Sequence, residues 1–228
     1  MELLVISDGH GDLEKLKSLS PIAEKVDGII YGGDFAAFQK PETGKPFLEE
    51  LLKLHKNIFA VLGNCDHPEF IKELEAKNIS CANKCLCFND FFISGSGGGS
   101  KFTGATPYER TEKELVSDFC IVEKKVNETG VPLKNLILVC HNPPYGAKTD
   151  KINPLIHVGS KLITAFIKKH KPVLVVSGHI HEAYAIDKIG DTLLLNPGAL
   201  MEGRYAIVKI NNLPEDKTEV TAELKSIY

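Results

Sequence analysis

The sequence predicts a layered α/β fold, and the pattern of its apolar residues is the reason. Short unbroken apolar runs, such as Leu3–Ile6 and Leu136–Cys140, are typical of strands that are buried on both faces. In the first half of the chain these runs alternate with segments of helical periodicity, and towards the end strands predominate. This order favours an α/β fold with helices around one central sheet or with two sheets packed together.

The first half of the chain is expected to alternate strictly between strand and helix. Its strands are the short apolar runs Leu3–Ile6, Ile29–Tyr31 and Ile58–Leu62. Its helices follow from apolar stripes at helical spacing, which are Leu13, Leu16 and Leu19, then Leu48, Leu51 and Leu52 within Phe47–His55, then Phe70, Ile71 and Leu74. Pro68 opens the last of these helices, because the N–H that proline lacks is unpaired at a helix start in any case.

The second half is expected to be richer in strands. The stretch Ile79–Ser94 is expected to form two short strands that are joined at Asn89–Asp90 as a hairpin. The glycine-rich stretch Gly95–Arg110 is long for a loop, which is compatible with a site rim or lid and equally with a plain connector. The remaining elements are helices over Glu112–Thr129 and Ser160–His170 and strands over Leu136–Cys140, Val173–Val176, Thr192–Leu195 and Tyr205–Ile210. No repeat or linker interrupts the order, so we expect one domain over residues 1–228.

Composition excludes several classes of protein. With 43% apolar residues among 228, the chain has enough material for a sizeable core. A net charge of −3 gives no basic footprint, so membranes and nucleic acids are not expected partners. The N-terminus lacks the basic start and long apolar core of a signal peptide, and no stretch is long enough to span a membrane.

The six cysteines point to a reducing compartment. Without a secretion signal they favour free thiols and a cytoplasmic location. Cys81, Cys85 and Cys87 lie close together but lack the paired CxxC spacing of a zinc site. Because Cys85 and Cys87 alternate along an expected strand, we interpret them as small buried side chains.

Five of the expected strands are followed directly by side chains that bind metals. These side chains are Asp8, His10, Asp34, Asn64, His141, His179 and His181. Ligands of open α/β sheets bind outside the carboxyl ends of the strands, so we expect the seven to converge on one cleft. Their number exceeds the needs of one metal ion and suits two ions about 3.5–4 Å apart that share a carboxylate.

In their order and context these blocks resemble the calcineurin-like metallophosphoesterases. The motifs are Asp8-x-His10, Gly33–Asp34, Gly63–Asn64, a lone His141 at a strand end, and Gly178–His179-x-His181. The length of the chain resembles the small, single-domain phosphodiesterase-type members. The resemblance implies two packed mixed β-sheets flanked by helices, a four-layer α-β-β-α sandwich, with the metal site at the C-terminal ends of the strands.

The resemblance also implies a role for each residue. Asp8, His10 and His181 match the ligands of one metal, Asn64, His141 and His179 match those of the other, and Asp34 matches the carboxylate that bridges both. The expected reaction is hydrolysis of small phosphodiesters, with phosphomonoesters as a second class, by attack of a metal-bridging hydroxide at a dinuclear centre. The ligand types suit two divalent transition-metal ions, manganese first, with iron, zinc, nickel and cobalt as alternatives.

The sequence departs from the family pattern in two places. Phe35–Ala36–Ala37–Phe38 replaces the aspartate and arginine that follow the bridging aspartate in protein Ser/Thr phosphatases, which disfavours that activity. Cys65 stands where many members have a histidine that stabilises the transition state or protonates the leaving oxygen, and a thiol is a weak donor. His67 is a candidate replacement, or else simply the residue before a helix. Asn142 is either a ligand-binding residue or part of a turn.

Three other functions compete with this hypothesis. An inert scaffold of the same fold would need a damaged metal site, yet all seven ligand positions are filled. A thiol enzyme that uses Cys65 would survive chelators and would be abolished by Cys65→Ala. A nuclease gains no support from an acidic chain. The expected partner is therefore a small phosphorylated substrate, and the sequence leaves the oligomeric state open.

Overall fold

The short apolar runs of the sequence form the centres of two β-sheets. The computed structural model describes residues 1–129, 135–213 and 217–227. The first sheet has the strand order β15 (Lys217–Ser226), β14 (Arg204–Leu213), β1 (Glu2–Ile6), β2 (Gly28–Tyr31) and β3 (Ile58–Ala60). The second has the order β12 (Ala185–Ile189), β13 (Thr192–Asn196), β11 (Leu174–Ser177), β8 (Leu136–Cys140), β5 (Phe91–Ser96) and β4 (Leu86–Phe88).

Strand direction places several carboxyl ends at one end of the molecule. In the first sheet β1, β2 and β3 are parallel, and β14 runs antiparallel to β1. In the second sheet β5, β8, β11 and β13 are parallel, and the edge strands β4 and β12 are antiparallel to their neighbours. Both sheets are therefore mixed, as expected.

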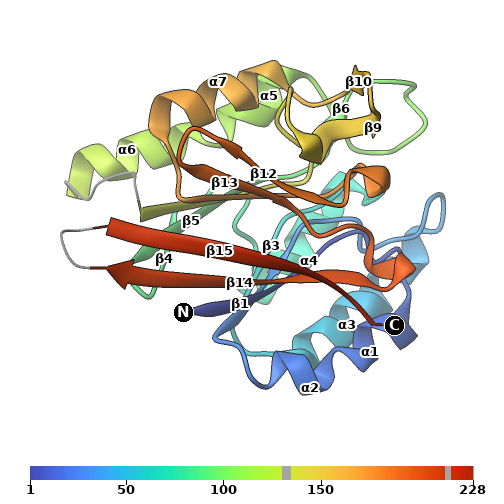
Figure 1. Cartoon of the computed structure of the whole chain (residues 1–228). Coiled ribbons are helices and arrows are strands. Elements are labelled where there is room, and N and C mark those ends of the chain that lie inside the picture. The colour runs from blue at the N-terminus through green and yellow to red at the C-terminus, as the bar shows by residue number, and fades with distance from the viewer. Residues whose placement is uncertain (130–134, 214–216, 228) are drawn as a thin grey trace.

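Helices cover the outer face of each sheet (Figure 1). On the first sheet they are α1 (Leu13–Ser18), α2 (Ser20–Ala23), α3 (Gly44–Leu54) and α4 (Ile71–Ala76). On the second they are α5 (Glu112–Ser117), α6 (Cys120–Thr129) and α7 (Lys161–His170). The order of layers is helix, sheet, sheet, helix, which confirms the expected four-layer sandwich.

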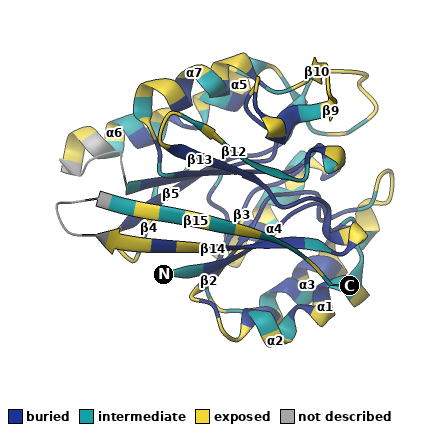
Figure 2. Cartoon of the chain, viewed as in Figure 1, coloured by how far each residue is buried: buried dark blue, intermediate teal, exposed yellow. Residues whose placement is uncertain are grey.

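The alternation of side chains along each strand separates the cores between these layers. Leu3 and Val5 of β1 pack between the two sheets, whereas Leu4 and Ile6 face the helices of the first layer. This is the period of two that a strand imposes on its side chains, applied to a strand with apolar residues on both faces. Figure 2 shows the buried strands between helices whose outer surfaces are exposed.

The structure corrects several of the expected elements. In the two large sheets two strands were missed: the edge strand β12, and β15, which pairs with β14 over its full length. The expected helix over Glu112–Thr129 is two helices, and Asp118 at the end of α5 binds Arg110 at 2.6 Å instead of continuing the helix. The helix expected from Pro68 begins as a 3-10 turn, η2 (Pro68–Phe70), ahead of α4.

The prediction that the clustered cysteines are all buried was wrong. Cys81 is buried in the core between the sheets, but Cys85 is half-buried and Cys87 is exposed. The reason is that β4 is an edge strand, so one of its faces meets solvent. Within the described residues no helix is both long and apolar enough to cross a membrane.

Candidate metal centre

The seven side chains expected at strand ends come from both sheets and meet at one end of the molecule. Backbone hydrogen bonds join the turns that bear them: Asp8 N–H donates to Gly33 O at 2.9 Å, and His10 N–H donates to Asp34 O at 3.0 Å. The second sheet joins them through His179, whose N–H donates to the Asp8 carboxylate at 3.1 Å. The convergence predicted from the sequence is therefore present.

Asp34 lies at the middle of the cluster. Its Oδ2 is 3.6 Å from His10 Nε2 and 3.5 Å from His141 Nε2. Its Oδ1 accepts a hydrogen bond from the N–H of Cys65 at 2.7 Å, which fixes the orientation of the carboxylate. One oxygen of Asp34 thus faces imidazoles from two different strand ends.

The other donors fall on two sides of Asp34. On one side His181 Nε2 lies 3.4 Å from both His10 Nε2 and Asp8 Oδ1. On the other, His141 Nε2 lies 2.9 Å from Asn64 Oδ1. The ring of His179 lies beside that of His141, with centroids 5.2 Å apart. Asp8 also lies close enough to Asp34 and His141 to form a third candidate metal-binding group with them.

The histidine tautomers fit a metal site. His10 Nδ1 faces the backbone carbonyl of Ala36 at 3.1 Å, and His141 Nδ1 faces that of Gly32 at 2.8 Å. A carbonyl can only accept, so each Nδ1 donates its proton to it, and each Nε2, the nitrogen that would bind a metal once unprotonated, is directed towards the cluster. Unprotonated imidazole nitrogens that converge with carboxylates are the donor set of a divalent transition metal.

The backbone at these residues is strained. Asp8, His10, Asp34 and His179 all have positive φ, between 45° and 67°. Residues other than glycine rarely adopt this conformation, which costs of order 1–3 kcal/mol each and tends to occur at functional sites. Gly63 relieves crowding next to Asp34, because a Cβ there would lie 1.9 Å from Asp34 Oδ1.

Two buried side chains that the sequence gave no reason to select hold the turns in place. The Tyr31 hydroxyl donates to Asp34 O at 3.0 Å and accepts from Gly9 N–H at 3.1 Å, so it links two ligand-bearing turns. Asp66 accepts from the N–H groups of Ala36 and Gly63, both at 2.8 Å. Asp66 therefore joins the turns after β2 and β3.

A third such residue is Asn196 at the end of β13. Its amide donates to Ile180 O at 2.9 Å and Gly178 O at 3.4 Å, and its Oδ1 accepts from Gly198 N–H at 2.9 Å. It therefore holds the turn that presents His179. The side chain of Asn196 thus supports the cluster from the second sheet.

Both burial and neighbouring charges shift the pKa values of the clustered side chains. Burial alone would raise the pKa of Asp34, but His141 and His10 outweigh it and hold the pKa well below the ordinary value. Burial would lower the pKa of His141, and the carboxylate of Asp34 instead raises it to about 9. For His179, burial and the neighbouring His141 lower the pKa to about 4. Carboxylate and imidazole charges thus compensate one another inside the protein.

Cys65 lies next to Asp34 but remains a thiol. Burial, followed by the negative charge of Asp34, raises its pKa above the ordinary value. The Asn64 amide donates to its Sγ at 3.6 Å, and the sulfur groups with His10 and Asp34 as a candidate metal-binding set. A protonated, buried sulfur is a poor nucleophile, which disfavours the thiol enzyme.

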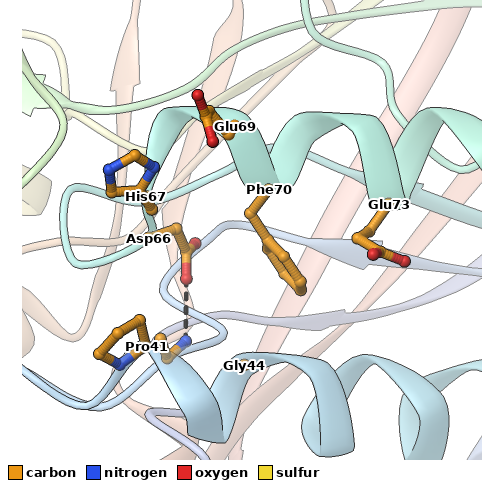
Figure 3. Close-up of a pocket in the computed structure, with 8 residues that line it drawn as sticks. Pro41, Gly44, Asp66, His67, Glu69, Phe70 and Glu73 are labelled. Atoms are coloured by element: carbon orange, nitrogen blue, oxygen red, sulfur yellow. Dashed lines mark hydrogen bonds between the residues drawn. The ribbon is translucent and has the colours of Figure 1, made fainter.

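His67 lies apart from the seven ligands. Its side chain is exposed at the start of η2 and lines a cavity of about 270 Å³ together with Pro41, Gly44 and Glu73. Figure 3 shows this cavity between the starts of two helices, with Asp66 at its inner wall.

Asn142 and the Gly95–Arg110 segment are both tied to the cluster. Asn142 is buried, accepts from Ser100 N–H at 2.8 Å and donates to Pro143 O at 3.1 Å, so its amide supports a loop. The segment contains the short strands β6 (Gly99–Ser100) and β7 (Glu109–Arg110). Tyr108 N–H donates to Asn64 O at 3.1 Å, and Gly99 packs against Asn64 and His179. The segment therefore borders the cluster.

Comparison with known proteins agrees with this geometry. Residues 1–212 match the calcineurin-like phosphoesterase superfamily domain. The chain is 34% identical over 203 residues to the uncharacterized protein MJ1162 of Methanocaldococcus jannaschii, covering 86% of this chain and 88% of that one. It is 26% identical over 168 residues to a probable glycerophosphodiester phosphodiesterase, GpdQ, of Arcobacter nitrofigilis, covering 72% of this chain and 59% of that protein.

A solved structure shares the fold across the full chain. The TT1561 protein of Thermus thermophilus superposes with a TM-score of 0.73 at 19% identity, covering 100% of this chain and 99% of that one. The match of the family domain, the 34% identical relative and the converging carboxylates and imidazoles agree with one another. The chain belongs to the calcineurin-like phosphoesterase superfamily and is a metallophosphoesterase, a hydrolase of phosphoric esters.

Proposed function

We propose that the chain, acting as one domain over residues 1–228, hydrolyses small phosphodiesters at a dinuclear metal centre, with phosphomonoesters as weaker substrates. The observation on which this depends is the position of Asp34, whose Oδ2 lies 3.5–3.6 Å from imidazoles of both donor groups. A carboxylate oxygen between two sets of donors suits a ligand shared by two cations.

Each predicted ligand would serve one side of the centre. Asp8, His10 and His181 would hold the first ion, and Asn64, His141 and His179 the second, with Asp34 common to both. Metal ions bound there would supply an activated water at neutral pH and would offset the negative charge of the phosphoryl group. The buried carboxylates and the backbone turns would keep these donors in position before substrate arrives.

The donor set also limits the choice of metal. Four imidazoles, two carboxylates and one amide form the proposed set, and among the described residues the one thiol that groups with it is that of the protonated Cys65. Imidazole-rich sites disfavour magnesium and calcium, which prefer oxygen ligands. We propose manganese as the first candidate, with iron, zinc, nickel and cobalt as alternatives.

Diesters are favoured over monoesters by the relative that carries a functional description. That relative is a probable glycerophosphodiester phosphodiesterase, and the match covers 59% of its length. Diester hydrolysis also needs a proton for the leaving oxygen. We propose His67 for this step, because it follows Asn64 by three residues and its imidazole is exposed.

The experiment is a substrate panel combined with a metal matrix. Metal-free protein is reconstituted with each divalent ion and assayed on bis(p-nitrophenyl) phosphate, p-nitrophenyl phosphate and glycerophosphodiesters. We expect close to two bound ions per chain by elemental analysis, loss of activity on chelation, and a higher kcat/KM for diesters. Binding of a single ion with full activity would contradict the dinuclear centre, and a preference for monoesters would contradict the substrate assignment.

The role of His67 needs its own measurement. His67→Gln is expected to lower kcat about 10²-fold for diesters with poor leaving groups, because general acid catalysis typically contributes 10²–10⁴-fold. Activated p-nitrophenyl esters need no proton on the leaving oxygen and should lose far less. His55→Gln, at a half-buried histidine outside the proposed ligand set, serves as the control. Equal losses for good and poor leaving groups would remove His67 from this role.

A further inference from the structure

In the part of the chain that the structure describes, the large apolar side chains that meet solvent lie on segments at one end of the molecule. Within the described residues, those that are exposed are Phe38, Phe102, Tyr145, Ile152, Leu155, Ile156, Val158, Leu162 and Met201. They lie on the segments that follow β2, β5, β8 and β13, up to the first turn of α7. Those parallel strands point their carboxyl ends towards the metal centre, so the apolar residues form a collar around it.

Much of this collar is a hairpin of β9 (Lys151–Asn153) and β10 (Ile156–His157), seen at the upper right of Figure 1. Leu155 at its tip is 90% exposed. The side chain of Asn153 closes the turn by accepting from Leu155 N–H at 2.9 Å and Ile156 N–H at 3.0 Å.

The base of the hairpin is anchored by one buried carboxylate. Asp150 accepts from Gly159 N–H at 3.0 Å and Ala147 N–H at 3.0 Å, and its Oδ1 lies 2.6 Å from His157 Nδ1. The hairpin is therefore a built element. Its apolar tip is held outward by hydrogen bonds and does not result from a loose loop.

The second exposed tip is built in the same way. Phe102 is 92% exposed. The carboxylate of Glu109 organises the turn beneath it by accepting from Phe102 N–H at 2.8 Å and Gly104 N–H at 3.0 Å. Exposure of a large apolar side chain costs solubility, and a fixed cluster of them marks a surface that binds an apolar group.

Both tips belong to segments that touch the metal centre. Strand β9 packs against η5 (His181–Ala183), which begins at a predicted ligand. The Phe102 segment contacts the centre through Gly99, which packs against Asn64 and His179. A ligand with phosphate at the metal centre would therefore have its remaining groups next to the collar.

Lysines on the same segments indicate what kind of ligand fits. Lys101 precedes Phe102 and is exposed, Lys151 begins β9, and Lys161 Nζ lies 5.1 Å from the centroid of Tyr145. These cations stand among apolar side chains on a protein whose net charge is −3. Apolar surface combined with local positive charge complements an amphiphile that carries a phosphate.

We propose that the substrate is an amphiphilic phosphodiester, with its phosphate at the metal centre and a hydrocarbon chain on the collar that includes Phe102 and Leu155. This inference rests on the proposed function and narrows its substrate class. Burial of each methylene on the collar strengthens binding by up to about fourfold, so specificity would depend on the length of the chain.

The test uses p-nitrophenyl alkyl phosphates in which the alkyl group grows from methyl to dodecyl. Assays are kept below the critical micelle concentration. For the wild-type chain we expect kcat/KM to rise at least 10-fold from methyl to octyl. In the double variant Phe102→Ser/Leu155→Ser the ratio of octyl to methyl should fall to within about threefold. Lys188→Ser, an exposed substitution on β12, should keep the wild-type ratio. A flat profile in the wild type overturns the proposal.

A binding measurement separates this proposal from the proposed function. Calorimetry with octylphosphonate and methylphosphonate on manganese-loaded protein reports chain recognition without turnover. If no ester is hydrolysed but octylphosphonate binds at least 10-fold more tightly than methylphosphonate, and the double variant loses the difference, the proposed function fails while recognition of the chain stands. If diesters are hydrolysed without any preference for longer chains, the function stands and the amphiphile is wrong.

Sedimentation equilibrium tests the alternative that a second copy of the chain, and not a substrate, covers the collar. A stable dimer that Leu155→Ser dissociates would make the collar a subunit interface and would overturn the proposal. A chain that is monomeric at assay concentrations leaves the collar free for substrate and supports it.

Discussion

Asp34 shows how much depends on a single side chain in this protein. It is buried, has positive φ, and places one oxygen between two imidazoles from different strand ends. Those imidazoles keep its pKa low although burial would raise it. Because it is the only group of the proposed set assigned to both ions, its loss should affect the whole centre.

Asp34→Ala is expected to reduce bound metal from about two ions to less than half an ion per chain and to lower kcat/KM at least 10³-fold. The physical reason is loss of the shared ligand and of the negative charge that offsets His10 and His141. Elemental analysis and steady-state kinetics measure the two effects. Asp191→Asn, an exposed aspartate in a turn, is the matched control. Full activity in Asp34→Ala would rule out a dinuclear mechanism.

Cys65→Ala distinguishes the metal enzyme from a thiol enzyme. We expect kcat/KM to fall less than 10-fold, because the thiol is protonated and its backbone N–H, which binds Asp34, is kept in the variant. A chelator should abolish the activity of both forms. Abolished turnover in Cys65→Ala with normal metal content would show that the sulfur takes part in the reaction.

The metal-binding side chains could be predicted from the sequence, but the residues that support them could not. Asp8, His10 and their counterparts are metal-binding residue types, and each follows an apolar run that predicts a strand. Residue type and place in the expected fold therefore both mark them as candidate ligands. Tyr31 and Asn196 act through hydrogen bonds to segments that are distant in sequence, the turn at Gly9 and the turn at Ile180. No local pattern reports such contacts, because they exist only after the strands have been ordered in their sheets.

Among the elements, every central strand of the two large sheets was predicted, and the two strands missed there, β12 and β15, lie at edges. Central strands such as β8 are apolar on both faces and stand out in the sequence. The edge strand β12 mixes polar and apolar residues that are mostly half-buried, which resembles a loop. In β15 the alternation that places Val220, Ala222 and Leu224 against the core is present but was not recognised.

The start of α7 gives a prediction about pH. Glu112 of α5 accepts from Ser160 Oγ at 2.8 Å and Leu162 N–H at 2.9 Å, so it joins two helices at the unpaired N–H groups of one of them. Burial would raise the pKa of Glu112, and these hydrogen bonds outweigh it and lower the pKa below the ordinary value. When folding lowers the pKa of a carboxyl group, that group stabilises the folded state at pH values above its pKa in the unfolded chain. This stabilisation is lost as the pH falls through the pKa of the folded chain.

We therefore expect Glu112→Gln to lower the free energy of unfolding by about 1 kcal/mol at pH 7, less than is usual for hydrogen bonds to a charged group, because solvent screens this partly exposed carboxylate. The difference from the wild type should shrink as pH falls below about 4. Urea unfolding at pH 7, 5 and 3.5 measures this. Glu24→Gln, at an exposed glutamate, is the control. A difference that is constant across this range would mean that the charge of Glu112 makes no contribution.

At the scale of the whole molecule, the sequence pattern left one sheet or two as open alternatives, and only the family resemblance selected two. The physical reason is that sheet membership depends on pairing between remote segments. Strand β14 follows the whole second sheet in sequence, yet it returns to pair with β1. Leu3 and Val5 face a core that both sheets share, so neither sheet has a buried inner face without the other.

This shared core and the metal centre lead to a prediction about thermal unfolding. The proposed ligands come from both sheets, with Asp34 and Asn64 after strands of the first and His141 and His179 after strands of the second. We expect one cooperative transition for the metal-free chain, shifted upwards as a whole by manganese. At a free concentration 100 times Kd, one site adds about 2.7 kcal/mol, which corresponds to about 5–10 °C for a chain of this size.

Differential scanning calorimetry at a series of manganese concentrations measures the shift. Asp34→Ala should lose most of it, whereas Asp191→Asn should keep it, which separates binding at the centre from weak binding elsewhere. Two separate transitions, with only one of them sensitive to metal, would contradict the single domain over residues 1–228. A single transition that metal leaves in place would contradict a centre that both sheets build, because ions that bind only the folded chain must stabilise it.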